Sequence, residues 1–108
     1  MIVGSDFDGT WTRHPEIWGK VDLIITGRSW EEYEDFKDLK EGPDVPVFFG
    51  EYGIDQKDRV TRAKHKADVI NKIEVTDYYE DDPVDAEVLR ILCPYTEIHM
   101  VVDQYTSL

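Results

Sequence analysis

The sequence predicts an α/β domain with a five-stranded, mainly parallel sheet. Five short apolar segments recur along the chain and are separated by stretches with helical features. Strands that alternate with helices form parallel sheets through right-handed crossovers. The chain has 108 residues, of which 41% are hydrophobic, which suffices for one core and leaves no room for a second. We therefore expect residues 1–108 to form a single domain.

The five segments are short apolar runs, which are typical of strands buried inside a parallel sheet. The expected strands span residues 1–5, 21–26, 45–49, 75–79 and 97–102. Pro46 lies near the start of the third segment, where the missing amide hydrogen is tolerated. In the fifth segment, Ile98, Met100 and Val102 recur at every second position. This period of two predicts that they share one face of the sheet.

Helices are expected between the strands. The first begins at the capping box Ser29-Trp30-Glu31-Glu32, whose Ser and Glu side chains satisfy free amides, and ends at Gly42-Pro43. The second spans about residues 63–73, and the third begins at Pro83, a favourable first-turn residue, and ends before Pro94. Inward-facing positions of the second helix are expected at Ala67, Ile70 and Ile73, and the third helix carries the apolar residues Val84, Val88, Leu89 and Leu92. Such helices on a parallel sheet predict a three-layer, Rossmann-like sandwich.

The charge balance excludes some partners. The chain carries 24 acidic and 12 basic residues, a net charge of −12. Such a surface repels nucleic-acid phosphates, although a 3′-phosphate end stays open as a substrate. No segment is long enough to span a bilayer, and no basic region precedes the first apolar segment as in a signal peptide. With Cys93 as the only cysteine, we expect a cytoplasmic protein without a membrane partner.

The clearest chemistry follows the first strand, in the run Ser5-Asp6-Phe7-Asp8-Gly9-Thr10. Residues two apart in an extended chain point the same way, so Asp6 and Asp8 can face a common point. Two such carboxylates repel each other unless a cation such as Mg²⁺ lies between them or one is protonated. Both conditions suit phosphoryl transfer through a carboxylate nucleophile. The alternative is an acidic turn, because Asp and Gly are common in turns.

Two later positions can bind a phosphate. The second strand ends at Thr26-Gly27, where a hydroxyl is available and glycine permits close approach. A fixed cation would offset the phosphate charge, and the candidates are Lys57, Lys64, Lys66 and Lys72. Lys66 lies beside the apolar stripe of the second helix and can lean toward the sheet, whereas Lys64 lies further round and is the second choice. The alternative for each lysine is an ordinary solvated charge.

The fourth strand runs into three successive acids, Glu80, Asp81 and Asp82. Carboxylate oxygens are the protein ligands that Mg²⁺ prefers. We expect Asp81 to bind the ion directly and Asp82 to bind it directly or through water. The alternative is an acidic helix N-terminus, which interacts favourably with the helix dipole, and this explanation suits Glu80 and Asp82.

These four motifs, in this order, resemble the haloacid dehalogenase superfamily, a large group of mostly phosphatases. Its signatures are a strand followed by Asp-x-Asp-Gly-Thr, a strand ending in Thr or Ser, a lysine opening a helix, and a strand followed by an acidic pair. The resemblance spans Asp6 to Asp82. It implies Asp6 as the nucleophile, Asp8 as the acid/base, and phosphate binding by Thr26, Gly27 and Lys66. The residues implied at the Mg²⁺ are Asp6, Asp8 through its carbonyl, Asp81 and Asp82.

The spacing resembles that of members without a cap domain. Only fifteen residues separate Thr10 from Thr26, enough for a short flap, and the interval up to Lys66 has no room for a cap. The resemblance thus implies an open, magnesium-dependent phosphatase that acts on a small phosphorylated substrate through an aspartyl-phosphate.

Two alternatives stay open. The first is a non-catalytic module that binds phosphate or a partner on the same scaffold. The second is a phospho-acceptor receiver domain, which the motif order disfavours, because receiver domains carry their acidic pair near the N-terminus. The sequence does not indicate an oligomeric state.

Overall fold

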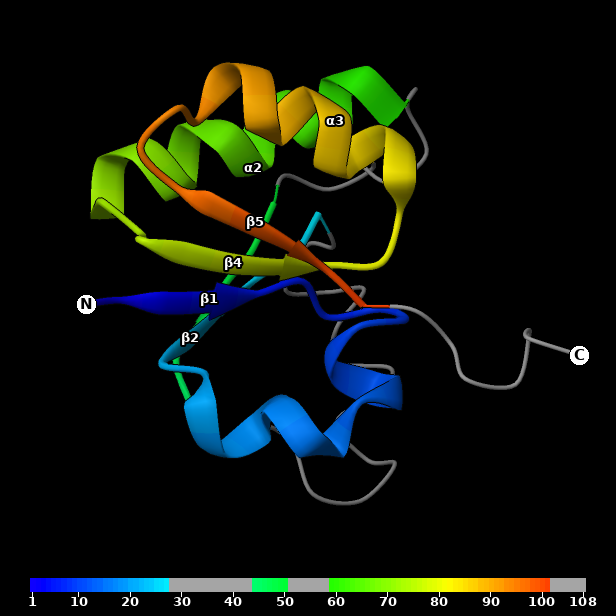
Figure 1. Ribbon diagram of the computed structural model, residues 1–108, viewed down its shortest axis with the longest axis vertical. Helices are drawn as coiled ribbons and strands as arrows, with labels where there is room; N and C mark the ends of the chain where they lie inside the picture. Colours follow the sequence, from blue (N-terminus) through cyan, green and yellow to red (C-terminus); the bar gives the residue numbers. More distant parts are fainter. Residues whose placement is uncertain (28–43, 51–58, 102–108) are drawn as a thin grey trace, which may run out of the picture.

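A computed structural model describes residues 1–27, 44–50 and 59–101. It confirms the α/β class and places the five expected strands in one sheet, in the order β3-β2-β1-β4-β5 (Figure 1). Every neighbouring pair is parallel, so the sheet is wholly rather than mainly parallel. The strands are β1 (Val3–Ser5), β2 (Leu23–Ile25), β3 (Val47–Phe48), β4 (Asp77–Glu80) and β5 (Glu97–Met100).

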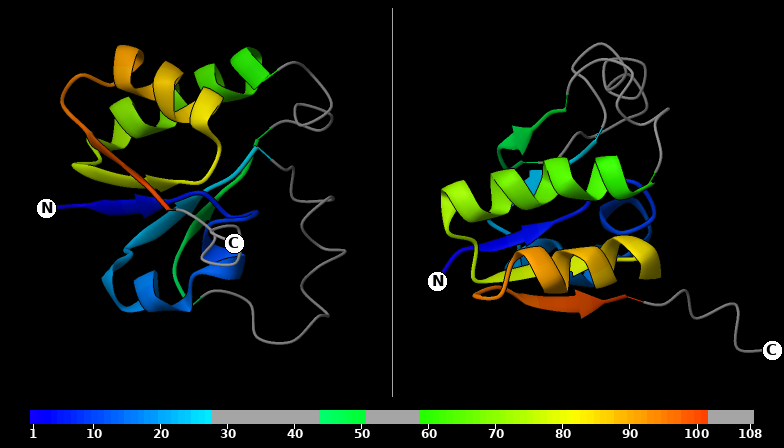
Figure 2. Two further views of the ribbon diagram at one scale, coloured as in Figure 1. Left: turned by 45° about the vertical axis from the view of Figure 1, so that its right-hand side comes forward. Right: turned by 90° about the horizontal axis from the view of Figure 1, so that it is seen from above.

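Helices α2 (Arg59–Ile73) and α3 (Pro83–Leu92) cover one face of the sheet. They lie side by side and run in the same direction, opposite to the strands, as crossover helices between parallel strands must (Figure 2). The 3₁₀-helices η1 (Trp11–Arg13) and η2 (Pro15–Lys20) lie on the other face, where the sequence indicated only a short flap. The helix expected to begin at Ser29 lies outside the described residues. Neither α2 nor α3 combines the length and apolarity that a bilayer crossing requires.

Both faces of the sheet are packed. The adjacent residues Ile24 and Ile25 of β2 point to opposite faces, and both are fully buried. Ile25 joins Ile70, Tyr78 and Leu89 in the core beneath α2 and α3. Ile24 joins the core on the opposite face, together with Val3, Phe7, Trp11, Ile17 and Val21. The central strands are therefore buried on both sides, which explains their continuous apolar sequence.

The buried face of α3 includes only some of its apolar residues. Val84 and Leu92 have exposed fractions of 39% and 38%. The buried positions of this segment are instead Asp85, Ala86, Leu89 and Cys93. With 3.6 residues per turn, Val84 lies about 200° around the helix from Ala86, so both cannot face the sheet. Asp85 therefore shares the buried stripe of α3 with the apolar residues Ala86 and Leu89.

We predict that Leu89→Ala lowers the free energy of unfolding by about 2–5 kcal/mol, because it leaves a cavity beneath α3. Ile91, two positions further along α3, is 71% exposed, so Ile91→Ala should change that free energy by less than about 0.5 kcal/mol. Urea unfolding followed by circular dichroism measures both. Equal losses in the two variants would contradict the orientation of α3.

Candidate functional site

The strand order determines where in the sheet a ligand site is expected. The chain builds β1, β2 and β3 toward one edge and then returns to add β4 and β5 beside β1. In such sheets, ligands bind beyond the carboxyl ends of the strands where the strand order reverses. Asp6 follows β1 and Asp81 follows β4, the two neighbours at this reversal. Thr26 follows β2 on the other side of β1.

A cavity of about 300 Å³ lies at this edge of the sheet. All seven residues that the sequence singled out for the site line it, and they come from four separate segments of the chain. They are Asp6, Asp8, Thr26, Gly27, Lys66, Asp81 and Asp82. The cavity is also lined by three residues that the sequence analysis did not assign to the site: Arg62, Glu80 and Asp85.

Lys66 lies at the centre of the site. Its Nζ donates to Asp6 Oδ1 at 3.1 Å, to Glu80 Oε2 at 3.1 Å and to Asp85 Oδ2 at 3.0 Å. The side chain is 3% exposed, and an ammonium group has three hydrogens, one for each carboxylate. Lys64, the second candidate, is exposed on α2. Of these two lysines, Lys66 is the one that contacts Asp6.

Among the described residues that line this cavity, carboxylates outnumber cations, and their pKa values reflect this imbalance. Burial raises the pKa of Asp6 well above its ordinary value; Lys66 opposes this shift, while the charge of Glu80 adds to it. Burial likewise raises the pKa of Glu80, against the opposing effect of Lys66. Burial disfavours the charge on Lys66, but the surrounding carboxylates, Asp6 first, raise its pKa well above the ordinary value. An added cation would relieve the surplus negative charge.

The turn after β1 connects the early acids with the late ones. The Thr10 hydroxyl is fully buried and lies 2.9 Å from Asp81 Oδ1 and 3.3 Å from Asp6 Oδ2. It can donate its proton to one of these carboxylates at a time. Gly9 has a positive φ of 77°, and a Cβ at this position would overlap the Asp81 carboxylate. The Gly-Thr pair therefore brings Asp6 and Asp81 close together.

Three carboxylates converge at this point. One oxygen from each of Asp6, Glu80 and Asp81 lies within 4.8 Å of the other two. Octahedral Mg²⁺ has oxygen ligands at about 2.1 Å, so opposite ligands are about 4.2 Å apart. The 4.8 Å limit on the spacing of the three oxygens is close to this value. The donors are all oxygen, which suits Mg²⁺ rather than a metal that prefers nitrogen or sulfur.

Asp82 lines the cavity, but its carboxylate caps a helix and does not join the other acids. Its Oδ1 accepts hydrogen bonds from the amides of Val84 at 2.8 Å and Asp85 at 3.3 Å, which makes it the N-cap of α3. Its Oδ2 lies 3.7 Å from Arg59 Nε and 3.6 Å from Arg62 Nη2. This is the helix-terminus role that the sequence left open as the alternative. Asp82 is not part of the converging trio, so its role as a metal ligand stays a prediction.

Two acids of the cluster were missed from the sequence. For Glu80 the sequence suggested a helix N-terminus as an alternative to a metal ligand, but Glu80 is the last residue of β4 and is fully buried. The sequence feature that could have predicted its burial is its position two residues after Tyr78, which places both side chains on the core face. Asp85 lies four residues before Leu89, on the buried stripe of α3. Its burial is explained by Lys66, a partner on another helix that local periodicity does not reveal.

The phosphate-binding candidates lie on the β2 side of the cavity. Thr26 and Gly27 are both buried, and the Thr26 amide donates to the Phe48 carbonyl at 3.0 Å. Because that amide is engaged with the β3 strand, a contact from Thr26 to a phosphate would come from its hydroxyl. Asp8 is half-buried and lines the same cavity.

Comparisons with protein-family models, with curated proteins and with solved structures found no match. A functional assignment therefore rests on the motifs and on the geometry of this cavity.

We predict that Lys66→Met lowers the free energy of unfolding at neutral pH by about 3–5 kcal/mol, because it leaves three buried carboxylates without their shared cation. Lys64→Met is the matched control and should change it by less than about 0.5 kcal/mol, since that lysine is exposed. Urea unfolding in the presence of a chelator measures both variants. A loss in Lys66→Met no larger than that in the control would mean that Lys66 does not neutralise the cluster.

The raised pKa values of Asp6 and Glu80 predict a pH dependence in the metal-free protein. Their ordinary pKa values are 3.8 and 4.5, so above these values the folded state binds more protons than the unfolded state. Their contribution to stability is complete below the ordinary values and is lost as the pH rises through the raised ones.

Unfolding in a chelator between about pH 4 and about pH 8 measures this slope. We expect Glu80→Gln to show a shallower decline than the unmodified chain, and added Mg²⁺ to restore stability at the upper end of the range. Parallel curves for the two proteins would rule out Glu80 as a source of the slope.

Proposed function

We propose that the protein is a magnesium-dependent phosphohydrolase of the haloacid dehalogenase type, which hydrolyses phosphomonoesters through an aspartyl-phosphate. One observation carries this proposal: Asp6 and Asp81, from opposite halves of the chain, line one cavity in which Lys66 contacts Asp6 at 3.1 Å. The motifs that surround them follow the order of that superfamily. The proposal includes its finer fold, a three-layer sandwich without a cap domain, and a cytoplasmic location.

In the first step, a carboxylate oxygen of Asp6 forms a bond to phosphorus while the bond from phosphorus to the ester oxygen breaks. The leaving oxygen takes the electron pair of that bond and a proton from Asp8. In the second step, Asp8 takes a proton from water as the water oxygen bonds to phosphorus. The bond from phosphorus to Asp6 then breaks, which releases inorganic phosphate and restores the carboxylate of Asp6.

Lys66 orients the nucleophile. Because its ammonium group also contacts Glu80 and Asp85, its position is set before a substrate arrives, and preorganised charges stabilise a transition state without reorganisation. The Thr26 hydroxyl and the Gly27 backbone would hold phosphoryl oxygens on the opposite side of the cavity. Lys66 thus has two roles: it fixes the Asp6 carboxylate and offsets the charge of the phosphoryl group.

The oxygens of Asp6, Glu80 and Asp81 fit a hard divalent cation, and the Asp8 carbonyl would complete the protein ligands. A Mg²⁺ ion held there supplies electrostatic stabilisation of the charge that develops on the phosphoryl oxygens. The same cation would lower the raised pKa of Asp6 and keep this carboxylate ionised for attack.

The proposed substrate is a small phosphorylated molecule. The cavity volume of about 300 Å³ lies at the lower end of the range for ligand pockets, which accommodates a phosphoryl group and a small part of its leaving group. The net charge of −12 weighs against long nucleic acids.

We predict that Asp6→Asn lowers phosphatase turnover at least about 1,000-fold, because an amide is a poor nucleophile. Asp68→Asn changes an exposed acid on α2 and should stay within about twofold of the unmodified protein. A panel of phosphomonoesters, assayed with and without Mg²⁺, provides the rates. Rapid acid quench with labelled substrate tests for the phosphorylated intermediate.

Three outcomes would contradict the proposal. Turnover by Asp6→Asn close to that of Asp68→Asn would remove Asp6 from the mechanism. Mg²⁺ binding without hydrolysis of any panel member would favour a non-catalytic module. Stable phosphorylation of the chain without release of phosphate would favour a phospho-acceptor domain.

A further inference from the structure

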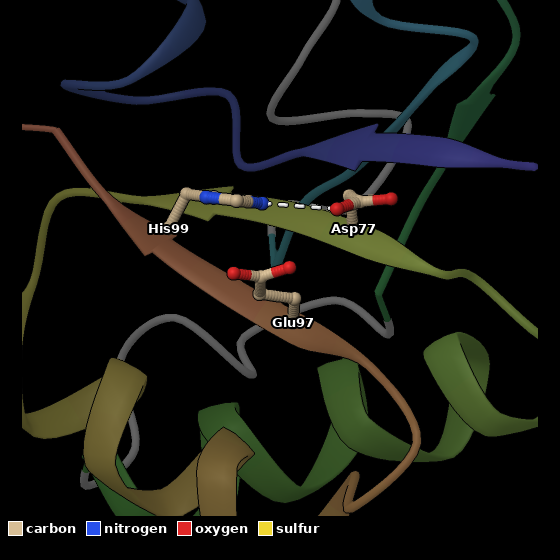
Figure 3. Close-up of side chains that lie close together, drawn as sticks. All are labelled: Asp77, Glu97 and His99. Atoms are coloured by element: carbon tan, nitrogen blue, oxygen red, sulfur yellow. Dashed lines mark hydrogen bonds and ion pairs between the residues drawn. The ribbon is translucent and has the colours of Figure 1, made fainter.

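A second group of metal-ligating side chains lies at the edge of the sheet formed by β4 and β5. It consists of Asp77, Glu97 and His99 (Figure 3). Asp77 pairs in register with Glu97, and His99 follows Glu97 by two residues. Tyr78 and Ile98 belong to the core beneath α2 and α3. Because side chains alternate along a strand, the three ligating residues point to the opposite face of the sheet.

The three side chains are already arranged around one point. His99 Nε2 lies 3.0 Å from Asp77 Oδ1, and the ligating atoms of all three residues lie within 4.8 Å of one another. The His99 ring stacks on Tyr79, with centroids 5.0 Å apart and an interplanar angle of 26°. The second oxygen of Asp77 accepts a hydrogen bond from the Thr76 hydroxyl at 2.9 Å. These contacts orient two of the ligands from behind, as outer-shell groups do at metal sites.

The donor set differs from that of the cavity. An imidazole nitrogen combined with carboxylate oxygens suits Zn²⁺ and related transition metals, whereas Mg²⁺ prefers oxygen alone. Ligands at about 2.05 Å in a tetrahedral Zn²⁺ site are about 3.3 Å apart, close to the 3.0 Å between His99 and Asp77.

We propose that Asp77, Glu97 and His99 bind Zn²⁺ with three protein ligands and a fourth position open to water. This site is distinct from the cavity around Lys66, because Glu80 of the same strand faces the helices and Asp77 faces away from them. The ion links β5, an edge strand, to its only neighbour in the described sheet, β4. The site therefore stabilises the edge of the sheet and takes no part in phosphoryl transfer.

The test is a titration of the full chain with Zn²⁺ alone near neutral pH. Isothermal titration calorimetry measures the affinity and the number of ions bound, and NMR of the histidine rings shows which histidine binds. We expect one ion to bind at this site with micromolar affinity and to shift the His99 ring signals. Glu97→Gln keeps the pair of His99 and Asp77 but removes the third ligand, and should weaken binding at least about tenfold. His99→Asn should abolish it.

Two controls separate this site from other zinc ligands. Asp81→Asn alters the cavity and should leave zinc binding by His99 unchanged. His14→Asn removes a histidine that pairs with Glu16 at 2.7 Å and should also leave it unchanged. The proposal is overturned if Glu97→Gln and His99→Asn bind Zn²⁺ as the unmodified chain does, or if the His99 signals do not respond at about millimolar Zn²⁺. The cluster would then be a surface ion pair only.

Discussion

One buried ammonium group, that of Lys66, holds together carboxylates from three separate parts of the fold. Asp6 follows the first strand, Glu80 ends the fourth and Asp85 lies in the first turn of α3, and all three contact the Nζ atom. A charged group is buried at tolerable cost only when partners of opposite charge surround it. The position of α2 is therefore constrained by the same contacts that build the cavity, and the apolar residues Ala63, Ala67 and Ile70 of that helix share the buried face with Lys66.

The surplus of negative charge at this centre links stability to function. With one lysine for three contacting carboxylates, burial raises the pKa of Asp6 and of Glu80. The metal-free site is thus more stable when it holds extra protons, whereas the proposed role of Asp6 as a nucleophile requires an ionised carboxylate. The proposed divalent cation would resolve this conflict, because it would replace the protons. Active sites commonly retain unfavourable electrostatic interactions of this kind, which lower the stability of the fold.

The alternation of side chains along β4 separates two kinds of chemistry on one strand. Tyr78 and Glu80 point toward α2 and α3, where Glu80 meets Lys66. Asp77 and Tyr79 point to the opposite face, where Asp77 pairs with His99 and Tyr79 stacks on its ring. The helix side presents oxygen ligands and a buried cation, while the other side presents an imidazole with two acids. A four-residue strand thereby contributes to two side-chain clusters with different donor atoms.

The sequence alone determined what depends on local pattern: the α/β class, the position of each strand, the limits of α3 and the candidates Asp6, Thr26, Lys66 and Asp81. Apolar runs, period-two alternation and Pro83 act within a few residues, so they can be recognised without a structure. Only the tertiary structure decided that Glu80 and Asp85 join the buried cluster, that Asp82 caps α3, and that Val84 and Leu92 face outward. These outcomes depend on contacts between residues that are far apart in the sequence. The carboxylates of Glu80 and Asp85 are buried because Lys66 reaches them from α2.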